Sequence, residues 1–167
     1  YAFHLHHHPC HGQRKQETKK TMKTSEKIIE ILTALVGFVL LYAAASKMLE
    51  VRIFLAQLLR QPFPTWMAYA LLVALPVTEL TACYLLAMPR HRGKGLFGAF
   101  ALMSAFTVYV WLGMTGRLGD VPCTCGGLLG RLMDWPTHFI FNVAVTALAL
   151  IGLLIHHWKG GNTRKVN

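Results

Sequence analysis

The chain has 167 residues, of which 54% are hydrophobic and only 14% are charged, and its mean hydropathy is +0.41. A soluble domain of this length needs more charge to cover its surface, so the composition excludes an ordinary soluble protein and indicates an integral membrane protein. The net charge of +10 is compatible with nucleic-acid binding in general. Here, however, the basic residues flank apolar segments, so we interpret them as topology signals and expect no nucleic-acid partner.

Residues 1–21 form a basic, histidine-rich extension that we interpret as disordered or not native to the protein. The stretch Met22-Lys23-Thr24-Ser25-Glu26-Lys27, followed by an apolar run, is typical of a bacterial start. Histidine- and cysteine-rich tracts can bind metals, but we favour unselected sequence over a metal site for His4, His6, His7, His8, Cys10 and His11. We predict no cleavable signal, because the first apolar run lacks an Ala-x-Ala site.

Four apolar segments then approach the ~20 helical residues that cross a hydrocarbon core. The predicted spans are residues 28–45, 66–88, 96–115 and 139–158. Each run is continuously apolar rather than alternating, which favours helices over barrel strands. The sequence therefore predicts an all-α integral membrane protein in which a four-transmembrane-helix bundle occupies residues 22–159 and a tail occupies residues 160–167.

The first connection between spans, about residues 47–65, contains a short amphipathic segment that we expect to lie at the outer membrane surface. Its apolar residues are Leu49, Ile53, Leu55, Leu58 and Leu59. Pro62 and Pro64 follow it, and prolines end a helix begun at residues 51–59.

The basic residues are distributed unevenly between the two ends of this bundle. Twelve of the 17 lysines and arginines precede the first span, lie between the second and third, or follow the fourth. By the positive-inside rule both termini are cytoplasmic, and the loop between the third and fourth spans is periplasmic. We therefore expect a multi-pass protein of a bacterial inner membrane, embedded in the lipid bilayer.

That loop contains the sequence Cys123-Thr124-Cys125-Gly126-Gly127. Two cysteines one residue apart come within bridging distance when the intervening residue turns, since disulfides need Cα atoms roughly 4.4–6.8 Å apart. A ring this small is expected to be strained, and strained or exposed disulfides are the labile or catalytic kind. The oxidising periplasm suits such a pair. We favour redox exchange over three alternatives, namely an inert loop disulfide, half of a zinc site with His138, and a pair that stays reduced.

Two residues near the loop are candidates to assist the thiols. His138 lies at the start of the fourth span, and a protonated imidazole lowers the pKa of a nearby thiol. Asn142 is one turn further on the same face and is a candidate to orient the ring. Lys47, at the outer end of the first span, is a second source of positive charge. The alternatives are an interfacial histidine at a helix start and a lysine that reaches the interface.

Glu79 is the main acidic intrusion into the spans. It lies 13 residues after Trp66, roughly 20 Å into the membrane, where an acid is costly and usually faces the bundle interior. We expect a role in proton handling or quinone contact, with structural hydrogen bonding as the alternative. Glu79 and Lys47 are not expected to share a depth, so Ser104 and Thr146 are the predicted partners of Glu79. Cys83 is expected to be a packing residue.

The chain resembles the methylamine-utilisation MauE/DoxX-like family in three features. These are Lys47, the segment Pro76-Val77-Thr78-Glu79-Leu80 and the Cys-Thr-Cys-Gly-Gly motif. Residues 135–142, Trp-Pro-Thr-His-Phe-Ile-Phe-Asn, are similar to the version seen in Bacteroidetes-type members. The resemblance implies a four-helix inner-membrane protein that supports maturation of disulfide-bearing periplasmic proteins with a thioredoxin-like partner. The resemblance also implies methylamine metabolism as a context, but the second glycine replaces the Cys-x-Cys-Phe-Gly arrangement of the methylamine member, so the resemblance supports the redox association more than the methylamine substrate.

We interpret the protein as a membrane component of thiol/disulfide exchange. Cys123 and Cys125 would exchange, His138 and Lys47 would favour the thiolate, and Glu79 would form a buried polar site. Whether the chain is itself an oxidoreductase is left open, and a quinone is a candidate acceptor without a sequence motif. The rival functions are a non-enzymatic assembly factor and a small-solute transporter centred on Glu79.

Overall fold

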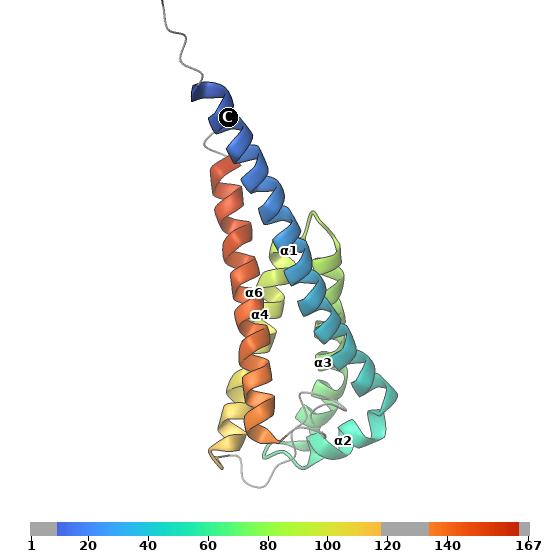
Figure 1. The fold of residues 1–167 in the computed structure, drawn as a ribbon. Helices are drawn as coiled ribbons and strands as arrows, with labels where there is room; N and C mark the ends of the chain where they lie inside the picture. The colour runs from blue at the N-terminus through green and yellow to red at the C-terminus, as the bar shows by residue number, and fades with distance from the viewer. Residues whose placement is uncertain (1–9, 118–133, 164–167) are drawn as a thin grey trace, which may run out of the picture.

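The computed structural model describes the backbone of residues 10–117 and 134–163, and the side chains of residues 24–117 and 134–158. Throughout this part the secondary structure is helical, which confirms the all-α prediction. The helices are α1 (Cys10–Leu49), α2 (Val51–Leu59), α3 (Thr65–Ala87), α4 (Arg92–Met114) and α6 (Trp135–Thr163) (Figure 1).

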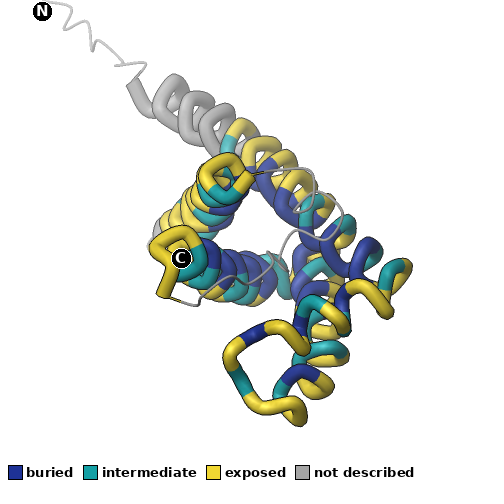
Figure 2. The backbone as a smooth tube through the Cα atoms, turned by 90° about the horizontal axis from the view of Figure 1, so that it is seen from below, coloured by how far each residue is buried: buried dark blue, intermediate teal, exposed yellow. Residues whose placement is uncertain are grey.

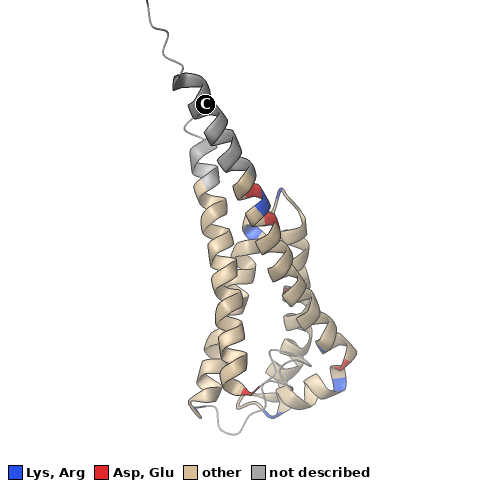
Figure 3. Ribbon diagram, viewed as in Figure 1, with Lys and Arg blue, Asp and Glu red and all other residues tan. Residues whose placement is uncertain are grey.

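Four helices are long and apolar enough to cross a membrane, as predicted. The candidate spans are Thr24–Leu49, Thr65–Ala87, Arg92–Met114 and Trp135–Trp158. Large apolar side chains such as Phe38, Ile140 and Leu154 point outward and are well exposed, as expected for a surface that faces lipid rather than water. Figure 3 shows that the described charged residues gather mainly toward the two ends of the bundle.

The bundle is a ring of four helices in which each packs against two neighbours. Helix α4 packs against α6 and α3, and α1 packs against α3 and α6, so α1 and α4 face each other across the ring. Seen along the bundle, the buried positions of these helices face the shared interior (Figure 2). The centre of the core is fully buried and includes Val36, Leu40, Ala99, Val110 and Ala149.

Helix α2 lies at one end of the bundle, against α3 and the end of α1, and we call this end the α2 end (Figure 1). It covers the residues expected from the sequence, and its buried Phe54 and Leu58 pack against Ala68 at the start of α3. The turn that follows is anchored to the bundle by buried Gln61, because the hydroxyl of Tyr109 on α4 donates a hydrogen bond of 2.8 Å to its Oε1.

At the opposite end α3 and α4 form a tight hairpin that depends on Gly95. A Cβ atom added at Gly95 would lie 2.6 Å from the backbone nitrogen of Leu86, which is closer than real side chains approach. The same addition at Gly98, one turn along α4, meets nothing within 4 Å. The role of Gly95 was not predicted, since a close backbone contact between helices leaves no signal in the hydropathy pattern.

The two terminal helices extend past the apolar segments. Helix α1 begins at Cys10, so its backbone is helical through part of residues 1–21, and α6 continues to Thr163. The domain boundaries placed at residues 21 and 159 remain predictions.

Candidate functional site

Lys47 occupies the last turn of α1, yet its side chain is only 1% exposed. Side chains on a helix lean toward its N-terminus, so the long Lys47 chain runs back along α1 into the bundle. Its Nζ accordingly lies 3.3 Å from the carbonyl oxygen of Ala43, one turn earlier, and donates a hydrogen bond to it. The alternative in which Lys47 reaches outward to the interface is therefore wrong.

The Lys47 Nζ also lies 2.7 Å from Oε1 of Glu79 on α3, and both side chains are completely buried. The expectation that these residues lie at different depths is wrong as well. Cys83 of α3 lies beside Gly37 of α1, with its Sγ 3.6 Å from the Gly37 carbonyl oxygen. By this register the backbones of Lys47 and Glu79 are offset by about 9 Å along the bundle.

The antiparallel arrangement of α1 and α3 closes this offset. Each side chain leans toward the N-terminus of its own helix, so Lys47 and Glu79 lean toward each other. In this hydrogen-bonded ion pair, each charge is compensated by its partner. A single charged side chain in this interior would have no such compensation.

Aromatic rings surround the ammonium group of Lys47. The Nζ lies 5.9 Å from the ring centre of Phe54 on α2 and 5.7 Å from that of Phe106 on α4, both within the range of a cation–π interaction. Helices α1, α2, α3 and α4 thus all contribute to one site near the α2 end.

The fourth long helix, α6, adds His138 and Asn142. Their side chains are 2% and 4% exposed, and Phe139 and Phe141 of the same helix pack against the core cluster that contains Phe106. Both ring nitrogens of His138, Nδ2 of Asn142 and Oε2 of Glu79 are buried without a hydrogen-bond partner among the described residues. Asn142 therefore does not orient the histidine ring through a hydrogen bond, contrary to the expectation.

Thr146, a predicted partner of Glu79, makes other contacts. Its hydroxyl donates to the carbonyl oxygen of Asn142 at 2.7 Å and lies 3.1 Å from the hydroxyl of Thr107 on α4. Ser104 makes no hydrogen bond to Glu79 in the described part of the chain, where Lys47 is the partner of this carboxylate instead. The predicted threonine and serine contacts are therefore wrong.

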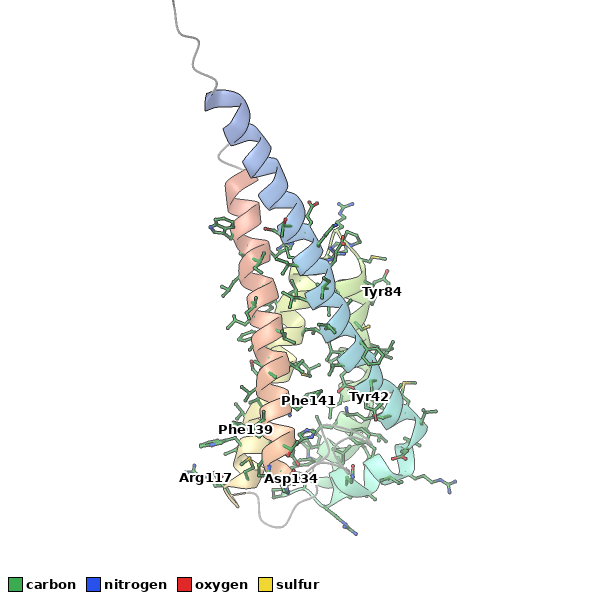
Figure 4. The ribbon with its side chains drawn as sticks, in the orientation of Figure 1. Tyr42, Tyr84, Arg117, Asp134, Phe139 and Phe141 are labelled. Carbon is green, nitrogen blue, oxygen red and sulfur yellow. The ribbon has the colours of Figure 1, made fainter. Side chains whose placement is uncertain are left out.

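The two cysteines of the Cys-x-Cys motif, Cys123 and Cys125, lie outside the described residues. The helices on either side of them end and begin at the α2 end, where Figure 4 labels the flanking residues Arg117 and Asp134. The chain on both sides of the motif is therefore anchored at the end of the bundle that holds Lys47, Glu79 and His138. Cys83 is free and half-buried on α3, consistent with a packing role.

Four further residues of this region were not predicted from the sequence: Phe54, Phe106, Gln61 and Tyr109. The two phenylalanines look like ordinary core residues, and only their contact with Lys47 distinguishes them. Gln61 carried a weak signal, because it is a polar residue directly before Pro62 in an otherwise apolar turn.

The arrangement combines a neutral ion pair, an imidazole and an amide inside an apolar bundle. Imidazole can accept or donate a proton, and the ion pair fixes a local electric field without net charge. The described residues contain no cluster of three or more histidine, cysteine or acidic side chains that would hold a metal ion.

A comparison with protein families identifies the relatives of this chain. The profile of the family described as "Methylamine utilisation protein MauE" matches residues 25–155, which include nearly all of the four spans and every residue of the site. The chain belongs to the MauE family. Separate comparisons with curated proteins and with solved structures found no significant match.

Proposed function

We propose that this MauE-family protein exchanges thiols and disulfides with a thioredoxin-like partner through Cys123 and Cys125. The observation that supports this most is His138, an imidazole with no described hydrogen-bond partner, buried at the start of α6. It lies four residues after Asp134, the described residue that follows the cysteine segment and that Figure 4 labels at the α2 end. A histidine in this position can take up the proton of a thiol that approaches it.

The exchange itself is balanced between the two proteins. The thiolate of one cysteine attacks the partner's disulfide, one partner sulfur leaves as a thiolate, and a mixed disulfide forms. The second cysteine then attacks this bond, so the partner leaves as a dithiol and Cys123 and Cys125 are joined. The reverse sequence oxidises the partner, and the relative reduction potentials decide the direction.

The distribution of basic residues supports a periplasmic position for the site. If both termini are cytoplasmic, the α2 end faces the periplasm, where thioredoxin-like proteins and disulfide-bearing clients meet oxidising conditions. The rival transporter function receives less support, because Glu79 is sealed from solvent and paired with Lys47 rather than lining an open path.

Covalent trapping tests this proposal. Cys123→Ser and Cys125→Ser should each leave one thiol of the motif, which captures a thioredoxin-like protein as a mixed disulfide that is detected by mass spectrometry after acid quenching. Cys83→Ser is the matched control, because this thiol lies in α3 and its loss should leave trapping unchanged. Absence of any mixed disulfide in both single variants, with the protein inserted in the membrane, would contradict the proposal.

A further inference from the structure

Three buried side chains of the site carry polar atoms that no described residue satisfies. These atoms are Oε2 of Glu79, Nδ2 of Asn142 and both ring nitrogens of His138. Leaving a buried polar group unpaired costs about 1–3 kcal/mol, so native proteins rarely keep several together. A group of three from α3 and α6 therefore indicates that a ligand supplies the missing hydrogen bonds.

The chemistry of these atoms restricts the ligand. A carboxylate oxygen only accepts hydrogen bonds, an amide nitrogen only donates them, and a neutral imidazole does one of each. The ligand must therefore carry both a hydrogen-bond acceptor and a hydrogen-bond donor, or a group that changes from acceptor to donor when it is protonated. Because Lys47 and Glu79 already neutralise each other, a neutral ligand fits better than a charged one.

The surroundings indicate where the ligand comes from. The site lies inside helices that span the membrane, and the rings of Phe54 and Phe106 flank its ammonium group. Flat aromatic walls and a hydrocarbon environment favour an apolar ring compound that partitions into lipid. The unpartnered atoms are closed to solvent, so binding requires neighbouring side chains to move, and Phe54 and Phe106 are candidates because their rings lie beside the Lys47 ammonium.

We propose that His138, Asn142 and Glu79 bind the headgroup of a lipid-soluble quinone that exchanges electrons with Cys123 and Cys125. The oxidised ring offers carbonyl oxygens that accept hydrogen bonds from Asn142 and His138. The reduced ring offers hydroxyl groups that donate to Glu79 and to His138 in its other tautomer. The same three side chains thus satisfy both redox states of the ligand.

This inference rests on the proposed thiol function for its electron donor, and the step is balanced. Two S–H bonds break and one S–S bond forms between Cys123 and Cys125, which releases two electrons and two protons. The two carbonyl oxygens of the quinone take up these protons with the electron pair and become hydroxyl groups.

Binding is tested independently of the thiols. The full chain carrying Cys123→Ser and Cys125→Ser is placed in phosphatidylcholine nanodiscs free of quinone, and a photoreactive azidoquinone is crosslinked in competition with decylubiquinone. In this background Asn142→Leu and His138→Phe should each weaken competition by about tenfold, the value of one buried hydrogen bond. Thr137→Val and Thr78→Val are matched controls on α6 and α3, because both side chains are exposed on the lipid side.

The outcomes separate the two proposals. Saturable crosslinking near His138 that decylubiquinone displaces, and that only the site variants weaken, supports the quinone site even if no thioredoxin-like partner is ever trapped. Crosslinking that does not saturate, or that is equal in site and control variants, overturns the quinone site and leaves thiol exchange with a protein partner unaffected. A His138→Gln variant checks folding, because it should restore part of the affinity through its amide.

Discussion

The ammonium of Lys47 and the carboxylate of Glu79 meet 2.7 Å apart inside the bundle although their backbones are offset along it. The pair links α1 to α3 at a point where neither residue contacts solvent. Removing one partner would leave the other charge buried and alone, whereas removing both would leave an apolar core. The difference between removing one residue and removing both can be measured by comparing the stabilities of single and double variants.

We expect Lys47→Met and Glu79→Leu each to lower the free energy of unfolding by about 3–5 kcal/mol, the usual effect of breaking a buried pair. The double variant should recover most of this stability, because no unpaired charge is left buried. It should still lose thiol exchange, because the Lys47 charge that favours the thiolate is absent. Unfolding in mixed micelles, followed by circular dichroism, measures these differences. Thr78→Val is the control on the exposed side of α3. A double variant no more stable than the singles would show that the two residues do not depend on each other.

The sequence was sufficient to predict the fold, because four continuous apolar runs leave few alternatives to a helical bundle. The amphipathic α2 and its end before Pro62 were also predictable, since proline stops a helix whatever its surroundings. The site residues Lys47, Glu79 and His138 were recognised one by one, as polar residues in or beside apolar segments.

Their mutual arrangement was not predictable in the same way. The depth of Lys47 was judged from its backbone position, but a side chain with four methylene groups reaches about a full helical turn along its helix. Likewise, the spacing of His138 and Asn142 predicts a shared face and not a hydrogen bond. Such contacts depend on side-chain conformations and on the register between helices, neither of which the hydropathy pattern encodes.

The hairpin between α3 and α4 gives a second prediction. We expect Gly95→Ala to destabilise the protein by about 1–3 kcal/mol, because its methyl group would collide with the backbone of Leu85 and Leu86. Gly98→Ala is the matched control on the same helix and should stabilise the protein by up to about 1 kcal/mol, since alanine favours helix and meets open space there. Thermal unfolding of the two variants in detergent gives the comparison, and equal effects would rule out a close contact at Gly95.

Membrane orientation provides a third prediction. In a chain without native cysteines, Arg117→Cys should react with a membrane-impermeant maleimide added to spheroplasts, whereas Arg90→Cys should react only after the membrane is opened. The reason is that Arg117 follows α4 at the α2 end, while Arg90 lies in the opposite turn, on the side that carries most of the basic residues. The inverse pattern would place the cysteine motif in the cytoplasm and remove the oxidising environment on which thiol exchange depends.

The last prediction concerns His138 and the rate of exchange. We expect His138→Ala to slow the reaction of Cys123 and Cys125 with a small disulfide reagent at neutral pH by at least tenfold, because a positioned base typically contributes 10²–10⁴-fold to such proton transfers. Stopped-flow measurement with dithiobis(nitrobenzoate) on the reduced protein gives the rate, and Thr137→Ala serves as the control one residue away. Adding imidazole to the solution should restore part of the lost rate if His138 acts as a base. A merely structural histidine would instead show no rescue, and its loss would lower thermal stability while the thiols reacted at the original rate.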